Sequence, residues 1–434
     1  MSKTQLGITK STTFMVSKQR MSLSGLLLVM VLFSCSIIAK PKNRAGSTKE
    51  TISNNENSGN GKLEEVKSFE PKKLKLGIER TELYLSLLKG KRVGVVSNQT
   101  GMIGNTHLVD TLLSAGINVT KVFAPEHGFR GKAGAGEHVS SSFDEKTGLP
   151  IVSLYGKTKK PSVEMMSELD VLIFDIQDVG VRFYTFISSL HYVMEACAEA
   201  NIPLIVLDRP NPNGNYVDGP VLDTAFRSFV GMHPVPIVYG MTIGEYGQMI
   251  NGENWLSDSV HCDLTIIPLA HYSRETEYIL PVPPSPNLRN NNSIYLYPSL
   301  CFFEGTSVSV GRGTDSPFEI YGHPLFPESD YTFVPQSQEG ATSPLWENQV
   351  CNGYDLRKSL RKRPKKFQLH YFMEAYELLN GETFVTNAPF LNRLIGNDQL
   401  MKQIEEGMSE TKIRATWQQE LVEFKIIRAR YLLY

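Results

Sequence analysis

The sequence predicts an α/β protein: a Rossmann-like domain with a doubly wound parallel sheet, followed by a smaller C-terminal α/β domain. Short apolar runs rich in Val, Ile, Leu and Phe alternate with helical stretches. Such continuous runs are typical of strands covered on both faces, and the alternation predicts parallel strands joined by helices. The pattern changes after residues 281–286 (Pro-Val-Pro-Pro-Ser-Pro), a stiff hinge or crossover. We therefore predict a Rossmann-like domain over 75–286 and the smaller domain over 287–434.

The N-terminus reads as an export signal. Lys18 and Arg20 precede a mostly apolar stretch, residues 23–33, which is short for a membrane span. It ends in Leu-Phe-Ser-Cys, which resembles a bacterial lipobox, where Cys35 would carry the lipid. We predict a signal peptide over 1–35; ordinary secretion with cleavage after Ala39 is the alternative. Either way we expect an exported protein of the periplasm or cell envelope, with the lipid anchoring it to a membrane.

Residues 36–74 are polar and rich in Lys, Ser, Asn and Glu, so they predict a flexible tether. Strands are expected at 93–97, 119–123, 151–154, 171–175, 204–207 and 264–267. Helices are expected at 107–115, 186–200 and 243–251. In the second of these, Phe186, Leu190, Val193 and Cys197 recur at three- and four-residue spacing, as one buried helix face does.

The C-terminal part has a different texture. We predict short strands and loops over 294–326 and helices at 371–379, 399–407 and 412–423. Together these elements indicate a smaller α/β domain. No repeat links it to the first domain.

Composition and missing motifs exclude several functions. The chain has 434 residues and a net charge of -1, without the basic excess of a general nucleic-acid binder. The first strand leads into residues 94–99 (Gly-Val-Val-Ser-Asn-Gln), so the dinucleotide-binding glycine pattern is absent. There is no GxSxG, HExxH or CxxC motif either. We expect no essential cofactor and no metal.

Polar residues gather directly after five of the predicted strands. The carboxyl ends of parallel strands share one edge of a sheet, and ligands of open α/β sheets bind there. The residues at this edge are Asn98, Glu126, His127, Tyr155, Asp175, Gln177, Asp178, Arg182, Asp208 and Arg209. Carboxylates that move protons, amides that bind hydroxyls and aromatic rings that cover sugar faces are typical of carbohydrate chemistry.

Structural explanations stand beside the functional ones. Glu126 is either catalytic or a helix cap, and His127 either acts in the site or is a structural histidine. Asp175 or Asp178 pairs with Arg182 as scaffold, or lies free to react. The neighbours Asp208 and Arg209 form either a local salt bridge or part of the site. Asn98 either binds substrate or only satisfies backbone groups of its loop.

Seven segments resemble the NamZ-type exo-β-N-acetylmuramidase family, and the likeness runs from about residue 75 to the C-terminus. They are residues 97–101 (Ser-Asn-Gln-Thr-Gly), 125–128 (Pro-Glu-His-Gly), 148–150 (Gly-Leu-Pro), 175–185, 208–212 (Asp-Arg-Pro-Asn-Pro), 304–306 (Glu-Gly-Thr) and 311–314 (Gly-Arg-Gly-Thr). The resemblance implies an active site in the cleft between the two domains. It also implies release of N-acetylmuramic acid from the non-reducing ends of peptide-free cell-wall glycan fragments, with Glu126 as the leading catalytic residue.

On this hypothesis Glu126 is a general acid that His127 tunes or assists. Asp175 or Asp178 activates water, unless the 2-acetamido group of the substrate is the nucleophile. The lactyl carboxylate of muramic acid needs a cation, for which arginine is well suited. The candidate arginines are Arg130, Arg182, Arg209 and Arg312; further substrate contacts are expected from Asn98, Tyr155, Gln177, Asp208 and Glu304.

Two other functions fit the same residues. A lipid-anchored protein that binds muropeptides or sugars would use a cleft between two lobes without chemistry. A metal-dependent hydrolase would use Glu126, His127, His138 and Asp175 as ligands, although their spacing matches no standard motif.

Overall fold

The largest sheet in the described residues has seven strands, in the order β11-β8-β7-β1-β4-β6-β5. The computed structural model describes residues 73–434 except 127, 130–141, 157, 361 and 382, so the predicted signal peptide and nearly all of the tether lie outside the described residues. The strands are β1 (Arg92–Ser97), β4 (Asn118–Ala124), β5 (Ser142–Phe143), β6 (Pro150–Ser153), β7 (Val171–Asp175), β8 (Leu204–Leu207) and β11 (Leu264–Ile267).

All pairings in this sheet are parallel except that of β5 with β6. The six parallel strands are the six predicted from apolar runs, which confirms the predicted sheet. Read from β6 to β11, the chain starts in the middle at β1, builds outward through β4 and β6, and then returns to build β7, β8 and β11. This is the Rossmann strand order, and its direction reverses between β1 and β7.

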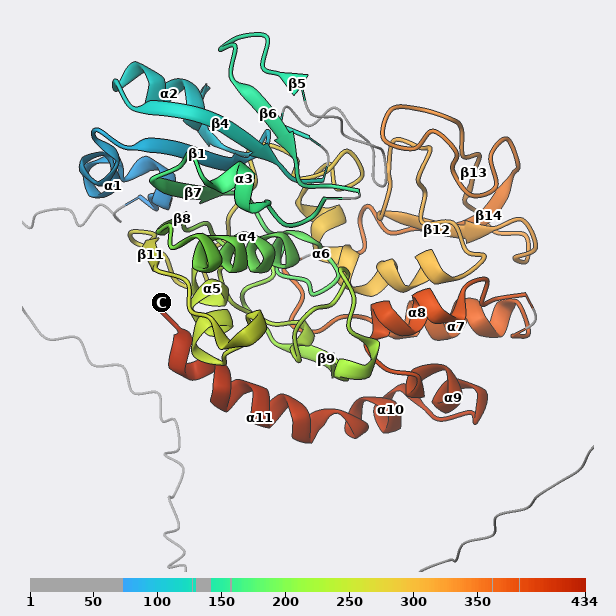
Figure 1. The fold of residues 1–434 in the computed structure, drawn as a ribbon. Coiled ribbons are helices and arrows are strands. Elements are labelled where there is room, and N and C mark those ends of the chain that lie inside the picture. The colour runs from blue at the N-terminus through green and yellow to red at the C-terminus, as the bar shows by residue number, and fades with distance from the viewer. Residues whose placement is uncertain (1–72, 127, 130–141, 157, 361, 382) are drawn as a thin grey trace, which may run out of the picture. The chain divides into compact units, whose positions relative to one another are not determined.

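Helices cover both faces of the sheet, as Figure 1 shows. One face packs against α1 (Thr81–Leu88) and α2 (Leu108–Ser114), through Val93 and Val95 of β1. The other packs against α3 (Val163–Met166), α4 (Phe186–Ala200) and α5 (Ile243–Gly252). A capping box starts α5, because the Thr242 hydroxyl accepts a hydrogen bond from the Glu245 backbone N–H and the Glu245 carboxylate accepts one from the Thr242 backbone N–H. Thus both faces are buried, as the apolar strands require.

The described residues of the C-terminal part add a small antiparallel sheet and six α-helices. The sheet has the order β12-β14-β13, formed by β12 (Ile320–His323), β13 (Thr332–Phe333) and β14 (Cys351–Asp355). The helices are α6 (Asn291–Leu300), α7 (His370–Leu378), α8 (Ala388–Ile395), α9 (Gln399–Glu405), α10 (Glu410–Thr416) and α11 (Gln418–Arg428). Before residue 286, the described residues also form two short antiparallel pairs of strands. They are β2 (Met102–Ile103) with β3 (Thr106–His107), and β9 (Asp218–Val221) with β10 (Pro236–Val238).

Two predictions in this part were wrong. Residues 291–300 form a helix where strands and loops were expected, because the Asn290 side chain caps the Ser293 N–H and starts it in spite of Pro298. The single helix predicted at 412–423 is two helices that meet at Trp417. That indole is 3% exposed and stacks on Phe367, so the chain turns to bury it.

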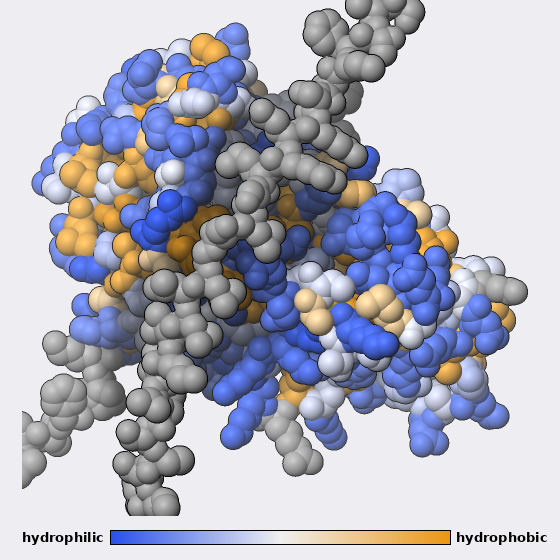
Figure 2. Space-filling model, turned by 90° about the horizontal axis from the view of Figure 1, so that it is seen from below, coloured by the Kyte–Doolittle hydropathy of each residue, from blue (hydrophilic) through white to orange (hydrophobic). Residues whose placement is uncertain are grey.

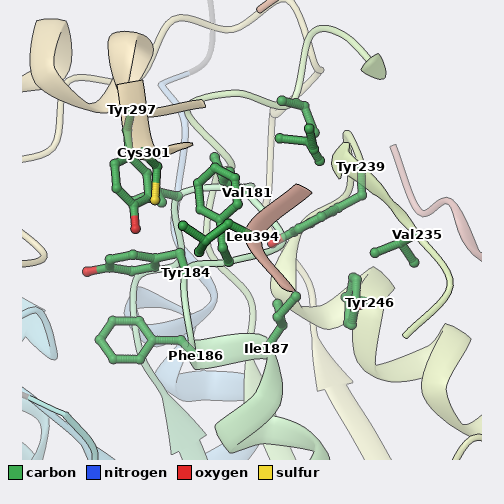
Figure 3. Close-up of a cluster of buried hydrophobic side chains, with 14 of the residues drawn as sticks. Val181, Tyr184, Phe186, Ile187, Val235, Tyr239, Tyr246, Tyr297, Cys301 and Leu394 are labelled. Carbon is green, nitrogen blue, oxygen red and sulfur yellow. The ribbon is translucent and has the colours of Figure 1, made fainter. Parts of the chain in front are cut away.

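One hydrophobic core joins the sheet to the C-terminal part. Phe186 and Ile187 of α4 belong to the same buried cluster as Tyr297 of α6 and Leu394 of α8, and Figure 3 shows these side chains around the start of α4. Outside the core, hydrophilic residues predominate on the face seen in Figure 2. Among the described residues no helix combines the length and apolarity needed to cross a bilayer.

Candidate active site

A cavity of about 460 Å³ lies between the carboxyl end of the sheet and the C-terminal part. Its volume is in the range of small-molecule sites. The segments before residue 286 contribute charged, polar and aromatic groups, and so do those after it. The lining includes Glu126, Tyr155, Lys159, Phe183, Tyr184, Thr185, Phe229, Asn287, Tyr297, Glu304, Arg312 and Phe318.

Glu126 follows β4 and is half-buried at the wall of this cavity. Thr185, the residue before α4, donates a hydrogen bond from its hydroxyl to Oε2 of Glu126 over 2.8 Å. The carboxylate is thereby tied to the start of a helix whose first residues are buried in the core. The described residues that follow, Gly128 and Phe129, are not helical, so they give no sign of the helix cap considered above. Its neighbours His127 and Arg130, both predicted site residues, lie outside the described residues.

Aromatic rings form a large part of the wall. Tyr297 meets Phe183 edge to face at 5.3 Å and Phe318 at 4.9 Å between ring centroids. Tyr184 donates its hydroxyl hydrogen to the carbonyl of Pro284 over 2.9 Å, which fixes it to the proline-rich segment. A wall of rings held by one another is a preformed surface for the apolar face of a ring-shaped ligand.

Glu304 and Arg312 face the cavity from the C-terminal part and pair with each other. Nε of Arg312 donates to Oε1 of Glu304 over 2.8 Å, and Nη2 donates to the same oxygen. The thiol of Cys301 donates to Oε2 over 3.6 Å. The guanidinium also lies 5.1 Å from the ring centroid of Phe318. Both residues were predicted as substrate contacts, and the structure places both, with Tyr155, on the cavity wall.

Lys159 was missed by the sequence reading. It lies in the loop after β6, lines the cavity and places Nζ 4.2 Å from the ring centroid of Phe229. A lysine among polar residues is typical of any solvated loop. The one feature of the sequence that could have indicated a site residue is that Lys159 lies shortly after a predicted strand. Thr185 was missed for a similar reason, since a threonine before a helix is common.

The predicted residues at the centre of the sheet edge are placed differently. Arg209 donates from Nε and Nη2 to the two oxygens of Asp175, over 2.7 and 2.9 Å. Arg209 is 4% exposed and Asp175 is fully buried. Burial opposes the charge of Arg209, but the carboxylate of Asp175 outweighs it and raises the pKa of the guanidinium. Arg209 therefore pairs with Asp175, and not with Asp208 in the local salt bridge considered as one alternative.

Asp178 and Asp208 are also buried in contacts with the protein. Asp178 accepts hydrogen bonds from the Gly180 N–H, over 2.7 Å, and from the Tyr239 hydroxyl. Asp208 accepts from the Gly244 N–H at the start of α5, over 2.8 Å, and from two hydroxyls. Burial raises the pKa of both carboxyl groups to about 6, against the effect of these hydrogen bonds. Neither residue lines the cavity.

Arg182 does not pair with Asp175 or Asp178, so that expectation was wrong. Its guanidinium is fully buried and donates to backbone carbonyls, including those of Pro220 and Val235 over 2.8 and 2.7 Å and that of Leu394 over 3.0 Å. Burial without a carboxylate lowers its pKa to about 9. Arg182 thus joins α8 to the β9–β10 segment and is not placed to bind a substrate.

The two predicted amides are buried as well. Asn98 accepts at Oδ1 from the backbone N–H and the hydroxyl of Thr100, over 3.0 and 2.6 Å. Gln177 donates from Nε2 to the carbonyls of Asp178 and Pro210, over 2.8 Å each. Both amides hold loops at the strand ends and are absent from the cavity wall.

No metal site emerges from the described part of the chain, where His, Cys, Asp and Glu side chains nowhere group in threes. Two of the metal ligands considered above, His127 and His138, lie outside the described residues. The described cavity wall offers carboxylates, one ammonium, one guanidinium, a threonine and aromatic rings. Such a wall can bind a sugar and move a proton.

Two family models match the chain. The N-terminal model of the exo-beta-N-acetylmuramidase NamZ matches residues 93–292, and the C-terminal model matches residues 295–434. The chain belongs to the NamZ family. This confirms the resemblance recognised in the seven motifs. The peptidoglycan beta-N-acetylmuramidase NamZ of Bacillus subtilis (strain 168) is 40% identical over 373 residues, which cover 81% of this chain and 89% of that protein.

Solved structures from the same family support the fold. A crystal structure of a DUF1343 family protein from Bacteroides fragilis NCTC 9343 is 48% identical and has a TM-score of 0.77, covering 84% of this chain and 99% of that one. A second DUF1343 family protein from that organism is 27% identical, with a TM-score of 0.71 and coverage of 83% and 99%. The predicted fold class is confirmed, whereas the predicted boundary at residue 286 stays a prediction.

Proposed function

We propose that this NamZ family member is an exo-acting glycoside hydrolase that releases N-acetylmuramic acid from the non-reducing ends of peptidoglycan fragments. The observation that carries this is the position of Glu126: a half-buried carboxylate, oriented by Thr185, at the wall of an aromatic cavity. A glycosidase needs such a group beside the scissile bond. The relative from Bacillus subtilis is named a peptidoglycan beta-N-acetylmuramidase, which supports cleavage at the same sugar here.

Glu126 acts as the general acid in this proposal. It protonates the glycosidic oxygen while the bond from that oxygen to the anomeric carbon breaks, and the shortened glycan leaves with the proton. Thr185 is a positioning residue, because its hydroxyl fixes the carboxyl group against the start of α4. The aromatic wall covers the sugar ring and keeps bulk water from the reacting carbon.

The second catalytic group is not Asp175 or Asp178 in this proposal, because both are buried and engaged away from the cavity. Glu304 lies on the wall, but its two oxygens are held by Arg312 and Cys301. The nucleophile in this proposal is the 2-acetamido group of the substrate, as in substrate-assisted glycosidases. Its carbonyl oxygen bonds to the anomeric carbon as the glycosidic bond breaks, and water then opens this ring to give N-acetylmuramic acid and returns a proton to Glu126. Glu304 and Arg312 then bind hydroxyl or acetamido groups of the sugar.

The decisive experiment is incubation with a disaccharide that carries N-acetylmuramic acid at the non-reducing end and N-acetylglucosamine at the reducing end. Mass analysis should detect both free sugars, and early NMR spectra should show that the muramic acid is first released as the β anomer. First release of the α anomer would contradict the substrate-assisted mechanism. Tight binding without any product would instead support the binding protein considered above.

A chelator distinguishes the remaining alternative. Activity that persists after treatment with a strong chelator is expected on the present proposal. Activity that is lost and then restored by a divalent ion would support a metal-dependent hydrolase instead.

We also propose that the protein is exported and anchored by a lipid on Cys35. The support is the basic flank, the short apolar stretch and the Leu-Phe-Ser-Cys segment in the sequence. In cells supplied with a labelled fatty acid, the protein should carry the label and sediment with membranes. The Cys35→Ala variant should lose both; a variant that keeps the label would overturn the assignment.

A further inference from the structure

The cavity has one described cation without a carboxylate partner. Of the arginines predicted to bind the substrate, Arg182 is engaged by carbonyls, Arg209 by Asp175 and Arg312 by Glu304. Each of these charges is already compensated or buried away from the cavity.

Lys159 differs from all three. It lines the cavity, and the described residues place no carboxylate within ion-pair distance of its ammonium. The adjacent Lys160 makes the contrast plain, since its Nζ lies 2.6 Å from a carboxylate oxygen of Glu195 and 2.6 Å from one of Glu199. The ring of Phe229 attracts the Lys159 ammonium and holds it at the wall without neutralising its charge.

The charges of the described wall therefore do not cancel when the site is ready to react. Glu304 and Arg312 compensate each other, and Glu126 is neutral in the form that donates a proton. What remains is the positive charge of Lys159. A partly desolvated cation at a ligand site favours an anionic group, and a compact ammonium suits a single carboxylate.

We propose that Lys159, positioned by Phe229, binds the lactyl carboxylate of the terminal N-acetylmuramic acid and makes the enzyme select the acidic sugar. This inference rests on the proposed function and names the residue that sets its specificity. The lactyl ether is the group that distinguishes muramic acid from glucosamine, so a cation there discriminates between the two. A lactyl group converted to an amide carries no charge and loses the ion pair.

The test compares two chromogenic substrates, 4-nitrophenyl β-N-acetylmuramide and the same compound with its lactyl carboxyl converted to a primary amide. The full-length wild type should prefer the acid by roughly 10- to 100-fold in kcat/KM, the range of a hydrogen-bonded charge pair. In Lys159→Met the preference should fall to about 1, mainly through a higher KM for the acid, with little change for the amide. Lys159→Arg should keep most of the preference.

Lys365→Met is the matched control. Lys365 is exposed and does not line the cavity, so its removal changes the net charge equally and should leave the preference intact. An unchanged preference in Lys159→Met, with a normal unfolding midpoint, would overturn the assignment of Lys159 alone. A wild type that cleaves neither substrate nor the disaccharide would overturn the proposed function itself.

Discussion

The sheet edge and the cavity wall both contain acidic and basic side chains, but those at the edge are buried and paired, whereas those at the wall are partly exposed. At the edge, around the point between β1 and β7 where the strand order reverses, Asp175 and Arg209 neutralise each other and are almost fully buried. At the wall, Glu126 is half-buried and Lys159 has an aromatic ring as its partner. The first group is part of the protein's own structure, whereas the second lines the cavity.

This difference explains where a ligand can bind on the present Rossmann-like sheet. The crevice at the switch point is the usual binding site of such sheets. Here Arg209 from the end of β8 reaches across to Asp175 at the end of β7 and fills that position with protein groups. The described cavity is displaced toward the ends of β4 and β6, where Glu126 and Tyr155 lie. Variants on the two sides should therefore fail in different ways.

The largest expected effect is that of Glu126→Gln. If Glu126 is the general acid, kcat for the muramide should fall by about 10²- to 10⁴-fold, since glutamine has the shape of the acid and no proton to give. The unfolding midpoint should stay near that of the wild type. Glu168→Gln is the control, because Glu168 is an exposed residue paired with Lys121. Near-normal turnover by Glu126→Gln would remove this residue from the mechanism.

Arg209→Met should act on stability. Removing one partner of a buried ion pair leaves the other charge uncompensated, at a cost of about 3–5 kcal/mol. Urea unfolding should show this loss. The double variant Arg209→Met/Asp175→Asn should recover part of it, because the stranded carboxylate is gone. If Arg209→Met instead keeps its stability and loses turnover, the edge belongs to the catalytic site after all.

Glu304→Gln should have a smaller effect, of roughly 10-fold on kcat/KM, in keeping with the loss of a charged hydrogen-bond partner. Glu304 holds Arg312 on the wall, so glutamine weakens the placement of that guanidinium without removing a proton donor. Measuring kcat and KM for Glu304→Gln beside Glu126→Gln tests whether the loss of activity is smaller in Glu304→Gln. A loss as large as that of Glu126→Gln would identify Glu304 as the second catalytic carboxylate.

The sequence predicted the sheet well because its strands are buried on both faces. The strands lie as predicted at Val171–Asp175 and Leu204–Leu207, because a continuous apolar run is stable only where both of its faces are buried. Of the polar residues predicted at the strand ends, Glu126 and Tyr155 line the same cavity. What the pattern lacks is the partner of each charge. No spacing in the sequence indicates which acid pairs with Arg209. Its partner in the structure is Asp175, which lies 34 positions earlier in the chain.

The C-terminal part was harder to predict for a related reason. Asn290 begins α6 by a local cap, but the proline inside that helix and the aromatic residues around it resemble a loop or strand. Lys159 shows the same limit for the site. Its importance depends on Phe229, 70 positions further along, and on the engagement of three arginines by groups that only the fold brings to them.

The smallest expected effect concerns a second buried polar group, on the α4 face of the sheet. Nδ1 of His191 lies 3.0 Å from Nε2 of His233, and the other nitrogen of His191 lies 3.5 Å from a Glu195 oxygen. Burial lowers the pKa of His191 from 6.5 to about 4, and Glu195 offsets only part of this. Between these two pH values His191 is therefore protonated in the unfolded chain and neutral in the folded protein.

The stability contributed by neutral His191 is complete above about pH 6.5 and is lost as the pH falls toward about 4. His191→Gln lacks this titration, so its unfolding midpoint should decline less steeply than that of the wild type over this range. The carboxyl groups of Asp178 and Asp208 titrate in both proteins and cancel in the comparison. Parallel slopes for the two proteins would mean that His191 is already protonated in the fold, and that Glu195 compensates its charge as Asp175 compensates Arg209 at the edge.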